Sequence, residues 1–170
     1  MRIRATLRQF SIDMNSYRRE LHREMDRQIK EAARAWLHAV VAQTPGPSGG
    51  KVPIWSGASA ATFSELAAAV AFPLGITPSG TAPNRISLGT KHGEGELVSN
   101  VDNGYRFRYR TTLEHLIFNE FNNANKVGFN LINPGPYDFQ GKGKAAFENV
   151  AQDARLPNPY RHIRTKTFTV

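Results

Sequence analysis

The strongest constraint on the fold is a long amphipathic helix, which the sequence predicts over residues 16–41. Apolar side chains recur there every three or four positions and so share one stripe. Asp26 and Lys30 on the opposite face have the spacing of an i,i+4 ion pair. Arg27 and Glu31 form a second such pair. The stripe consists of Tyr17, Leu21, Met25, Ile29, Ala33, Trp36, Leu37, Val40 and Val41. We expect this helix to be the main structural support of the fold.

Shorter elements are predicted around this helix. Alternating apolar and polar residues indicate a strand near the start, over 2–8, and a closing strand over 162–170. Asp102-Asn103-Gly104 is a hairpin turn signal between strands at 97–101 and 105–112. Helical periods follow at 60–71, with Ser56 or Ser59 as its N-cap, and at 145–154.

Two stretches lack clear periodicity and are predicted to be long loops, near 73–95 and 122–143. A short strand at 85–88 is expected inside the first. Residues 115–121 fit either a short helix or a strand. The fold class that follows is α+β: an antiparallel sheet with a long N-terminal helix and one or two shorter helices packed on one face.

Length and composition indicate an ordinary globular chain. Its 170 residues predict a single domain over 1–170. The absence of cysteine excludes disulfides and thiolate metal sites. The first residues lack the apolar core of a signal peptide, and the longest apolar run is too short to cross a bilayer. We therefore expect a protein that is soluble and intracellular when made.

The net charge of +8 favours contact with anionic surfaces, nucleic acid above all. The same charge is also typical of basic proteins that carry it as a solvated coat or bind an acidic protein partner.

Three arginines at alternate positions are the most distinctive charged motif. Arg106, Arg108 and Arg110 fall on one face of the predicted strand. The opposite face carries the aromatic residues Tyr105, Phe107 and Tyr109. Three interpretations fit the row: a solvated outer face over an aromatic core, a contact with an acidic neighbouring subunit, or a contact with phosphate.

Motifs for catalysis are weak. Ser59 lies in a near match to the Gly-x-Ser-x-Gly elbow, but a loop precedes it where that motif needs a buried strand. Residues 135–143 resemble a phosphate loop, yet the spacing is one residue too long and Gly143 stands where Ser or Thr is needed. The five histidines have no metal-ligand spacing. We predict no enzyme activity, no cofactor and no metal.

Taken in order, the parts resemble the tail-completion or neck proteins of tailed bacteriophages. The matching elements are a long helix ending at Thr44-Pro45, the segment 55–63 that opens on Trp55-Ser56-Gly57, and the apolar stretch 115–121 with Glu120. The resemblance covers residues 15–155. An insert at 46–52, the residues after Glu120 and the loop near 73–95 depart from the family pattern.

The resemblance implies a structural virion protein at the head–tail interface or the tail end. It implies a ring of identical copies, sixfold or twelvefold, that completes or terminates the tail and lets DNA pass. The implied partners are a connector or head-completion protein, a tail-tube protein and genomic DNA, with assembly in the host cytoplasm and no membrane contact. Candidates for the subunit interface or the DNA path are Arg106, Arg108, Arg110, Trp55 and Phe63. The alternatives are a basic DNA-binding protein, another head-completion or minor capsid component, and a hydrolase that uses Ser59.

Overall fold

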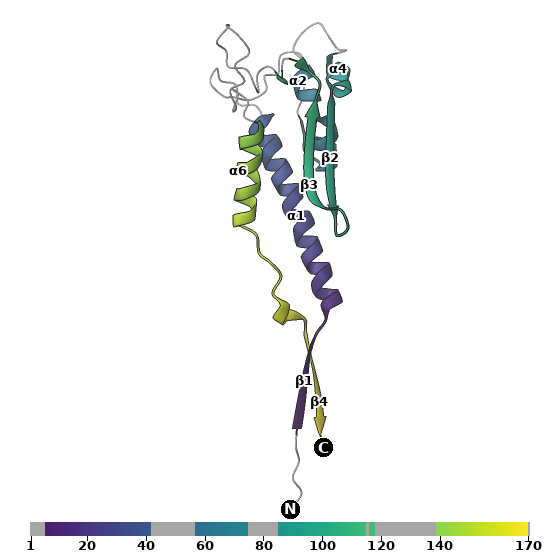
Figure 1. The fold of residues 1–170 in the computed structure, drawn as a ribbon, viewed down its shortest axis with the longest axis vertical. Helices are drawn as coiled ribbons and strands as arrows, with labels where there is room; N and C mark the ends of the chain where they lie inside the picture. Colours follow the sequence, from purple (N-terminus) through teal and green to yellow (C-terminus); the bar gives the residue numbers. More distant parts are fainter. Residues whose placement is uncertain (1–5, 42–56, 75–84, 115, 118–138, 170) are drawn as a thin grey trace, which may run out of the picture.

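The computed structural model describes residues 6–41, 57–74, 85–114, 116–117 and 139–169. They form an elongated molecule with a helical and sheet body at one end and a two-stranded ribbon projecting from the other (Figure 1). The elements are β1 (Thr6–Ile12), α1 (Met14–Val40), α2 (Ala58–Ala61), α3 (Ser64–Ala69), α4 (Arg85–Lys91), β2 (Gly93–Asn100), β3 (Gly104–Thr111), α6 (Phe139–Gln152), the 3-10 helix η1 (Pro159–His162) and β4 (Ile163–Thr169). The predicted α+β class with a long N-terminal helix is confirmed.

Helix α1 runs through the body as its longest element, 27 residues. Both predicted ion pairs form on its surface. Lys30 Nζ lies 2.8 Å from Asp26 Oδ2, and Arg27 Nη1 lies 2.5 Å from Glu31 Oε2. The buried positions of the helix all lie in its second half: Ile29, Ala32, Ala33, Trp36, Leu37 and Val40. The body is therefore built around the C-terminal half of α1.

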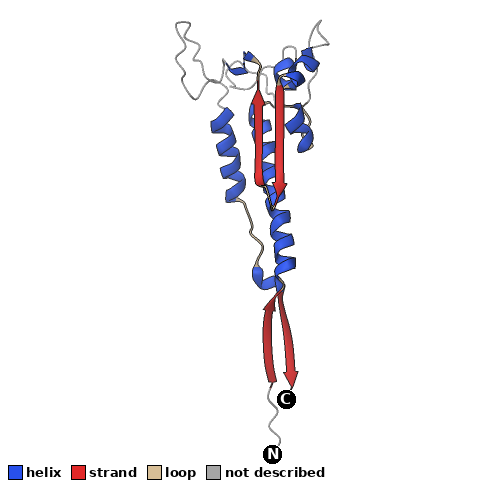
Figure 2. Cartoon of the chain, turned by 45° about the vertical axis from the view of Figure 1, so that its right-hand side comes forward, coloured by secondary structure: helices blue, strands red, loops and turns tan. Residues whose placement is uncertain are grey.

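A hairpin and helix α6 flank this half of α1 (Figures 1 and 2). The hairpin β2–β3 is antiparallel, with Gly93 opposite Thr111 and Asn100 opposite Gly104. The predicted turn is confirmed at 101–103. Gly104 ends it with φ at 79°, a left-handed conformation that glycine adopts without strain.

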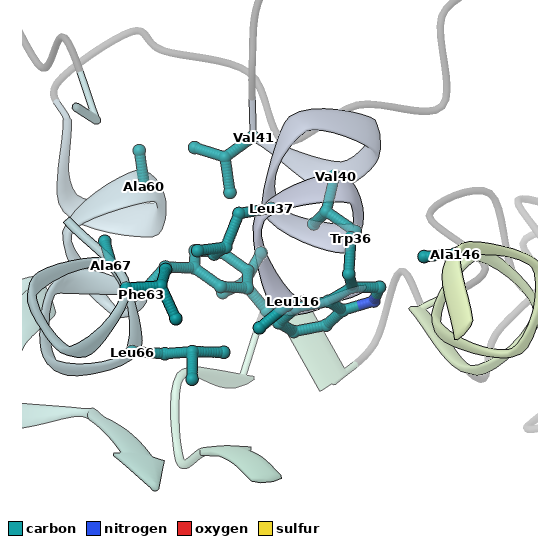
Figure 3. Close-up of a cluster of buried hydrophobic side chains, with 12 residues drawn as sticks. Trp36, Leu37, Val40, Val41, Ala60, Phe63, Leu66, Ala67, Leu116 and Ala146 are labelled. Carbon is teal, nitrogen blue, oxygen red and sulfur yellow. The ribbon is translucent and has the colours of Figure 1, made fainter. Parts of the chain in front are cut away.

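The core lies between α1, α3 and the inner face of the hairpin (Figure 3). Its centre is the fully buried ring of Phe63, between α2 and α3. The Tyr109 ring stacks on it at a centroid distance of 4.2 Å and an interplanar angle of 13°. The Trp36 ring meets Phe63 edge-on at 5.7 Å, and its Nε1 donates a hydrogen bond to the Phe139 carbonyl oxygen at 2.8 Å. These rings join α1, β3 and the start of α6.

The helical turns of 58–69 approach the chain of α4 and β2 unusually closely. An ideal Cβ built on Gly93 would lie 1.9 Å from the Thr62 carbonyl oxygen, so only glycine fits there. Similar close approaches pair Gly89 with Ala58 and Gly95 with Leu66. The partner residues are four apart in sequence, about one helical turn, so the contact follows one side of this segment.

The terminal strands form a second sheet, separate from the hairpin. Strands β1 and β4 pair antiparallel along their full length, from Thr6 opposite Thr169 to Ile12 opposite Ile163. The single expected sheet is thus two sheets of two strands. This β1–β4 ribbon extends beyond the N-terminal end of α1, away from the body (Figure 2).

Three local predictions were wrong. Residues 85–88, expected as a strand in a loop, begin α4, because Gly89 lets this helix pack tightly on Ala58. Residues 139–143, expected in a loop, are the first turns of α6, and Gly143 lies against the Trp36 ring at 3.5 Å. Ser59 is inside α2 and does not cap it, since the N-cap is Gly57 with φ at 78°.

Candidate interaction surfaces

The arginine row lies on the outer face of the hairpin, as its period of two predicted. Arg106, Arg108 and Arg110 are exposed, whereas Phe107 and Tyr109 point into the core. Tyr105, also on the inner face, forms a hydrogen bond with His22 Nδ1 near the turn. Of the three interpretations, the structure therefore supports an outer face over an aromatic core.

Acidic side chains of the same chain balance much of this row. Glu96 Oε1 lies 3.5 Å from Arg106 Nη2, and Glu96 Oε2 lies 3.9 Å from Arg108 Nη1. Glu94 pairs with Arg110 in the strand register. The two ion pairs of Glu96 are half-exposed, so each contributes little to stability. Together they leave this face close to neutral.

The acidic side of this face could have been found from the sequence. Counting back from the Asp102-Asn103-Gly104 turn places Glu94 and Glu96 on the same face as the arginines. The contact between Glu65 of α3 and strand β2 could not be predicted in this way, because Glu65 belongs to a different element. Its Oε2 accepts a hydrogen bond from the Gly95 backbone N–H at 2.8 Å.

Phe63 is inside the subunit, so its side chain packs the core of the chain and does not lie on the surface. The neighbouring Thr62 is also buried, and its hydroxyl lies 2.6 Å from the Tyr109 hydroxyl. Burial raises the pKa of Tyr109 to about 12, against hydrogen bonding that lowers it. Trp55, the other predicted aromatic anchor, is outside the described residues, as are Glu120 and the motif at 44–45.

A polar junction joins the ribbon to the start of α1. Asp13 caps the helix by accepting a hydrogen bond from the Ser16 backbone N–H at 3.1 Å, which lowers the pKa of its carboxyl. The same carboxylate forms an ion pair with Arg164 of β4. His162 Nε2 lies 2.6 Å from Glu20 Oε2, and its ring meets Tyr17 edge-on. These contacts fix the direction in which the ribbon leaves the body.

The ribbon itself has two chemically different faces. Opposed residues of an antiparallel pair share a face, and faces alternate along each strand. One face carries Phe10 and Ile12 with their partners Thr165 and Ile163 next to the body, and Arg8 with Thr167 further out. The other face carries Gln9 with Lys166 and Ser11 with Arg164 next to the body, and the apolar pair Leu7 and Phe168 at its outer end. We call them the apolar face and the basic face.

The apolar face is open to solvent. Phe10 is 66% exposed, Ile12 46% and Ile163 37%. Tyr160 of η1, close to the ribbon's root, is 75% exposed. Single exposed apolar residues are common, but a cluster of them on one face of an isolated ribbon marks an interaction surface.

Within the described residues, no cluster of three or more histidine and carboxylate side chains is arranged to hold a metal ion. No helix in the same part of the chain is both long and apolar enough to span a bilayer. Comparisons of the chain with models of protein families, with curated proteins and with solved structures find no match.

Proposed function

We propose that this chain is a structural virion protein of a tailed phage. Copies of it form a ring at the head–tail interface or at the tail end, which completes or terminates the tail and lets DNA pass. The resemblance of the helix, the 55–63 segment and the 115–121 stretch to neck proteins motivates this assignment. A connector or head-completion protein and a tail-tube protein are its proposed neighbours.

The observation that carries the proposal is the projecting ribbon. A two-stranded sheet alone is marginally stable in water and needs a third strand or a packing partner. The ribbon has neither within the described residues, and its apolar face is exposed. A neighbouring subunit supplies the missing partner, because burying apolar surface stabilises by about 25 cal/mol per Å².

A ribbon that docks on its neighbour also explains a ring. The ribbon and the body are at opposite ends of the molecule (Figure 1). Contact between the ribbon of one copy and a different surface of the next is head-to-tail. Such contacts close into a ring when the rotation between copies allows it. We propose the apolar face of the ribbon as the main contact, and the arginine row as a polar contact with an acidic neighbour.

Mass measurement of the purified full-length chain, alone and mixed with a tail-tube protein, tests the proposal. We expect a discrete multiple of the 18.9 kDa chain mass in at least one condition. The variant Phe10→Ser/Ile12→Ser should reduce the mass towards that of a monomer, because it removes the apolar contact. Phe147→Ser, at an exposed position on α6, is the matched control and should leave the mass unchanged. A monomeric wild type in every condition would contradict the proposal.

The alternative of a basic DNA-binding protein is favoured by the net charge alone. The arginine row gives it little support, because Glu94 and Glu96 lie beside those arginines.

A further inference from the structure

We infer that the basic face of the β1–β4 ribbon binds the phosphate backbone of double-stranded DNA. The observation is where the positive charge lies. Residues 1–13 and 161–170 contain six basic and one acidic residue, a net charge of +5. The other 147 residues contain sixteen basic and thirteen acidic residues, a net charge of +3. Most of the excess charge is therefore in these two segments of the sequence, and their described part, residues 6–13 and 161–169, contains four basic residues and one acidic residue.

The described side chains of this end are available to a ligand. Arg161, Arg164 and Lys166 are all exposed. Arg164 forms an ion pair with Asp13 and is still 74% exposed. Arg161 and Lys166 make no ion pair with a carboxylate among the described residues. Strands β1 and β4 contain no Asp or Glu, so the ribbon presents one sign of charge.

The shape of the ribbon suits a duplex. The major groove of B-DNA is wide enough to admit a two-stranded β-ribbon. Seven residues per strand at about 3.3 Å each give a length of about 23 Å, roughly two-thirds of a helical turn of DNA. In the half of the ribbon next to the body, the basic face offers Lys166, Arg164 and the polar side chains of Gln9 and Ser11, which contact phosphate and sugar oxygens. Such contacts position a protein without reading sequence.

The hairpin is the competing candidate, and its charges argue against it. Its three arginines share their face with Glu94 and Glu96, and DNA would bring phosphates next to those carboxylates. Among the described residues, the acidic neighbours of the ribbon are both at its root: Asp13, and Glu20 beside His162. An anionic ligand such as DNA is therefore attracted more strongly to the ribbon than to the hairpin.

DNA binding by the basic face is compatible with the proposed ring but does not require it. The apolar face of the ribbon is assigned to a neighbouring copy, which leaves the opposite face free for DNA. A monomer that never forms a ring still carries the basic face. Failure of the ring and failure of this inference are therefore separate results.

The test is the salt dependence of DNA binding by the full-length chain. Fluorescence anisotropy of a labelled duplex of mixed sequence is titrated from about 50 to about 200 mM salt, the range over which phosphate contacts weaken strongly. The ribbon variant Arg164→Gln/Lys166→Gln, which removes both cations of the basic face, is compared with the hairpin variant Arg106→Gln/Arg110→Gln. Both lower the net charge by two, so a general charge effect is the same in each. Urea midpoints check that both variants are folded.

We expect the ribbon variant to lower the slope of log affinity against log salt by about 1.8, which is two phosphate contacts at about 0.9 each. The hairpin variant should retain most of the slope. Equal losses in the two variants, or no binding by the wild type at about 50 mM salt, would overturn the inference. So would a ribbon variant that binds DNA normally but changes the oligomeric mass, because its basic face would then contact protein.

Discussion

At the scale of the residue, a few aromatic rings determine how the body holds together. Phe63, Tyr109 and Trp36 come from three separate segments of the chain, and their ring centroids lie 4.2–5.7 Å apart. Their burial could be anticipated for Trp36, from the apolar stripe, and for Tyr109, from the strand period. For Phe63, the helical period predicted at 60–71 indicated an apolar position, but the break between α2 and α3, where Phe63 lies, gives no clear signal in the sequence.

Replacing Phe63 tests its role as a core residue. We expect Phe63→Ala to lower the free energy of unfolding by about 3–5 kcal/mol, because it removes a fully buried ring and leaves a cavity beside Tyr109. Urea denaturation followed by circular dichroism measures this loss. Phe147→Ala, at a position that is 53% exposed, should change the stability by less than about 0.5 kcal/mol. A comparably small effect of Phe63→Ala would refute the core assignment.

Glu24 gives the chain a predictable response to acid. Hydrogen bonds from Arg27 and Gln28 lower the pKa of Glu24 from 4.5 to about 2. A carboxyl whose pKa is lower in the folded state than in the unfolded state stabilises the fold at pH values above its unfolded-state pKa. That contribution is lost as the pH falls from about 4.5 towards 2. The urea midpoint should fall over this window, and Glu24→Gln should make the fall smaller. An unchanged profile in the variant would show that the Glu24 contacts contribute nothing.

At the scale of the element, the long helix and the hairpin were predictable, and the pairing of the other segments was not. The period of three to four in α1 and the Asp102-Asn103-Gly104 turn are local signals. Gly89 of α4 and Gly143 of α6 were predicted to lie in loops. Each of them instead packs against a residue that is distant in the sequence. Local sequence carries no information about that partner.

Substitutions at two glycines distinguish a position where a Cβ would overlap its neighbour from a position where a Cβ has room. Gly93→Ala should destabilise the protein by about 1–3 kcal/mol or more, since the new Cβ would overlap the Thr62 carbonyl. Gly143→Ala should stabilise it by about 0.5–1 kcal/mol, because the Trp36 ring is at an ordinary contact distance of 3.5 Å and alanine favours a helix. Thermal unfolding of the two variants measures both effects. Equal effects would mean that the close approach of β2 to Thr62 is not a real constraint.

At the scale of the whole molecule, the described parts of the chain have a body at one end and a two-faced ribbon at the other (Figure 2). The sequence predicted a strand near each terminus, but not that these strands pair with each other, because their contact spans nearly the whole chain. That pairing brings Arg8 of β1 into the same ribbon as Arg164 and Lys166 of β4. One apolar face and one basic face fit a subunit that contacts both a neighbouring copy and DNA.

Electron microscopy of the purified full-length chain, with and without a tail-tube protein, tests the central claim most directly. We predict class averages of a closed ring with a central opening and a constant number of subunits. Separate elongated monomers in every condition would contradict the account.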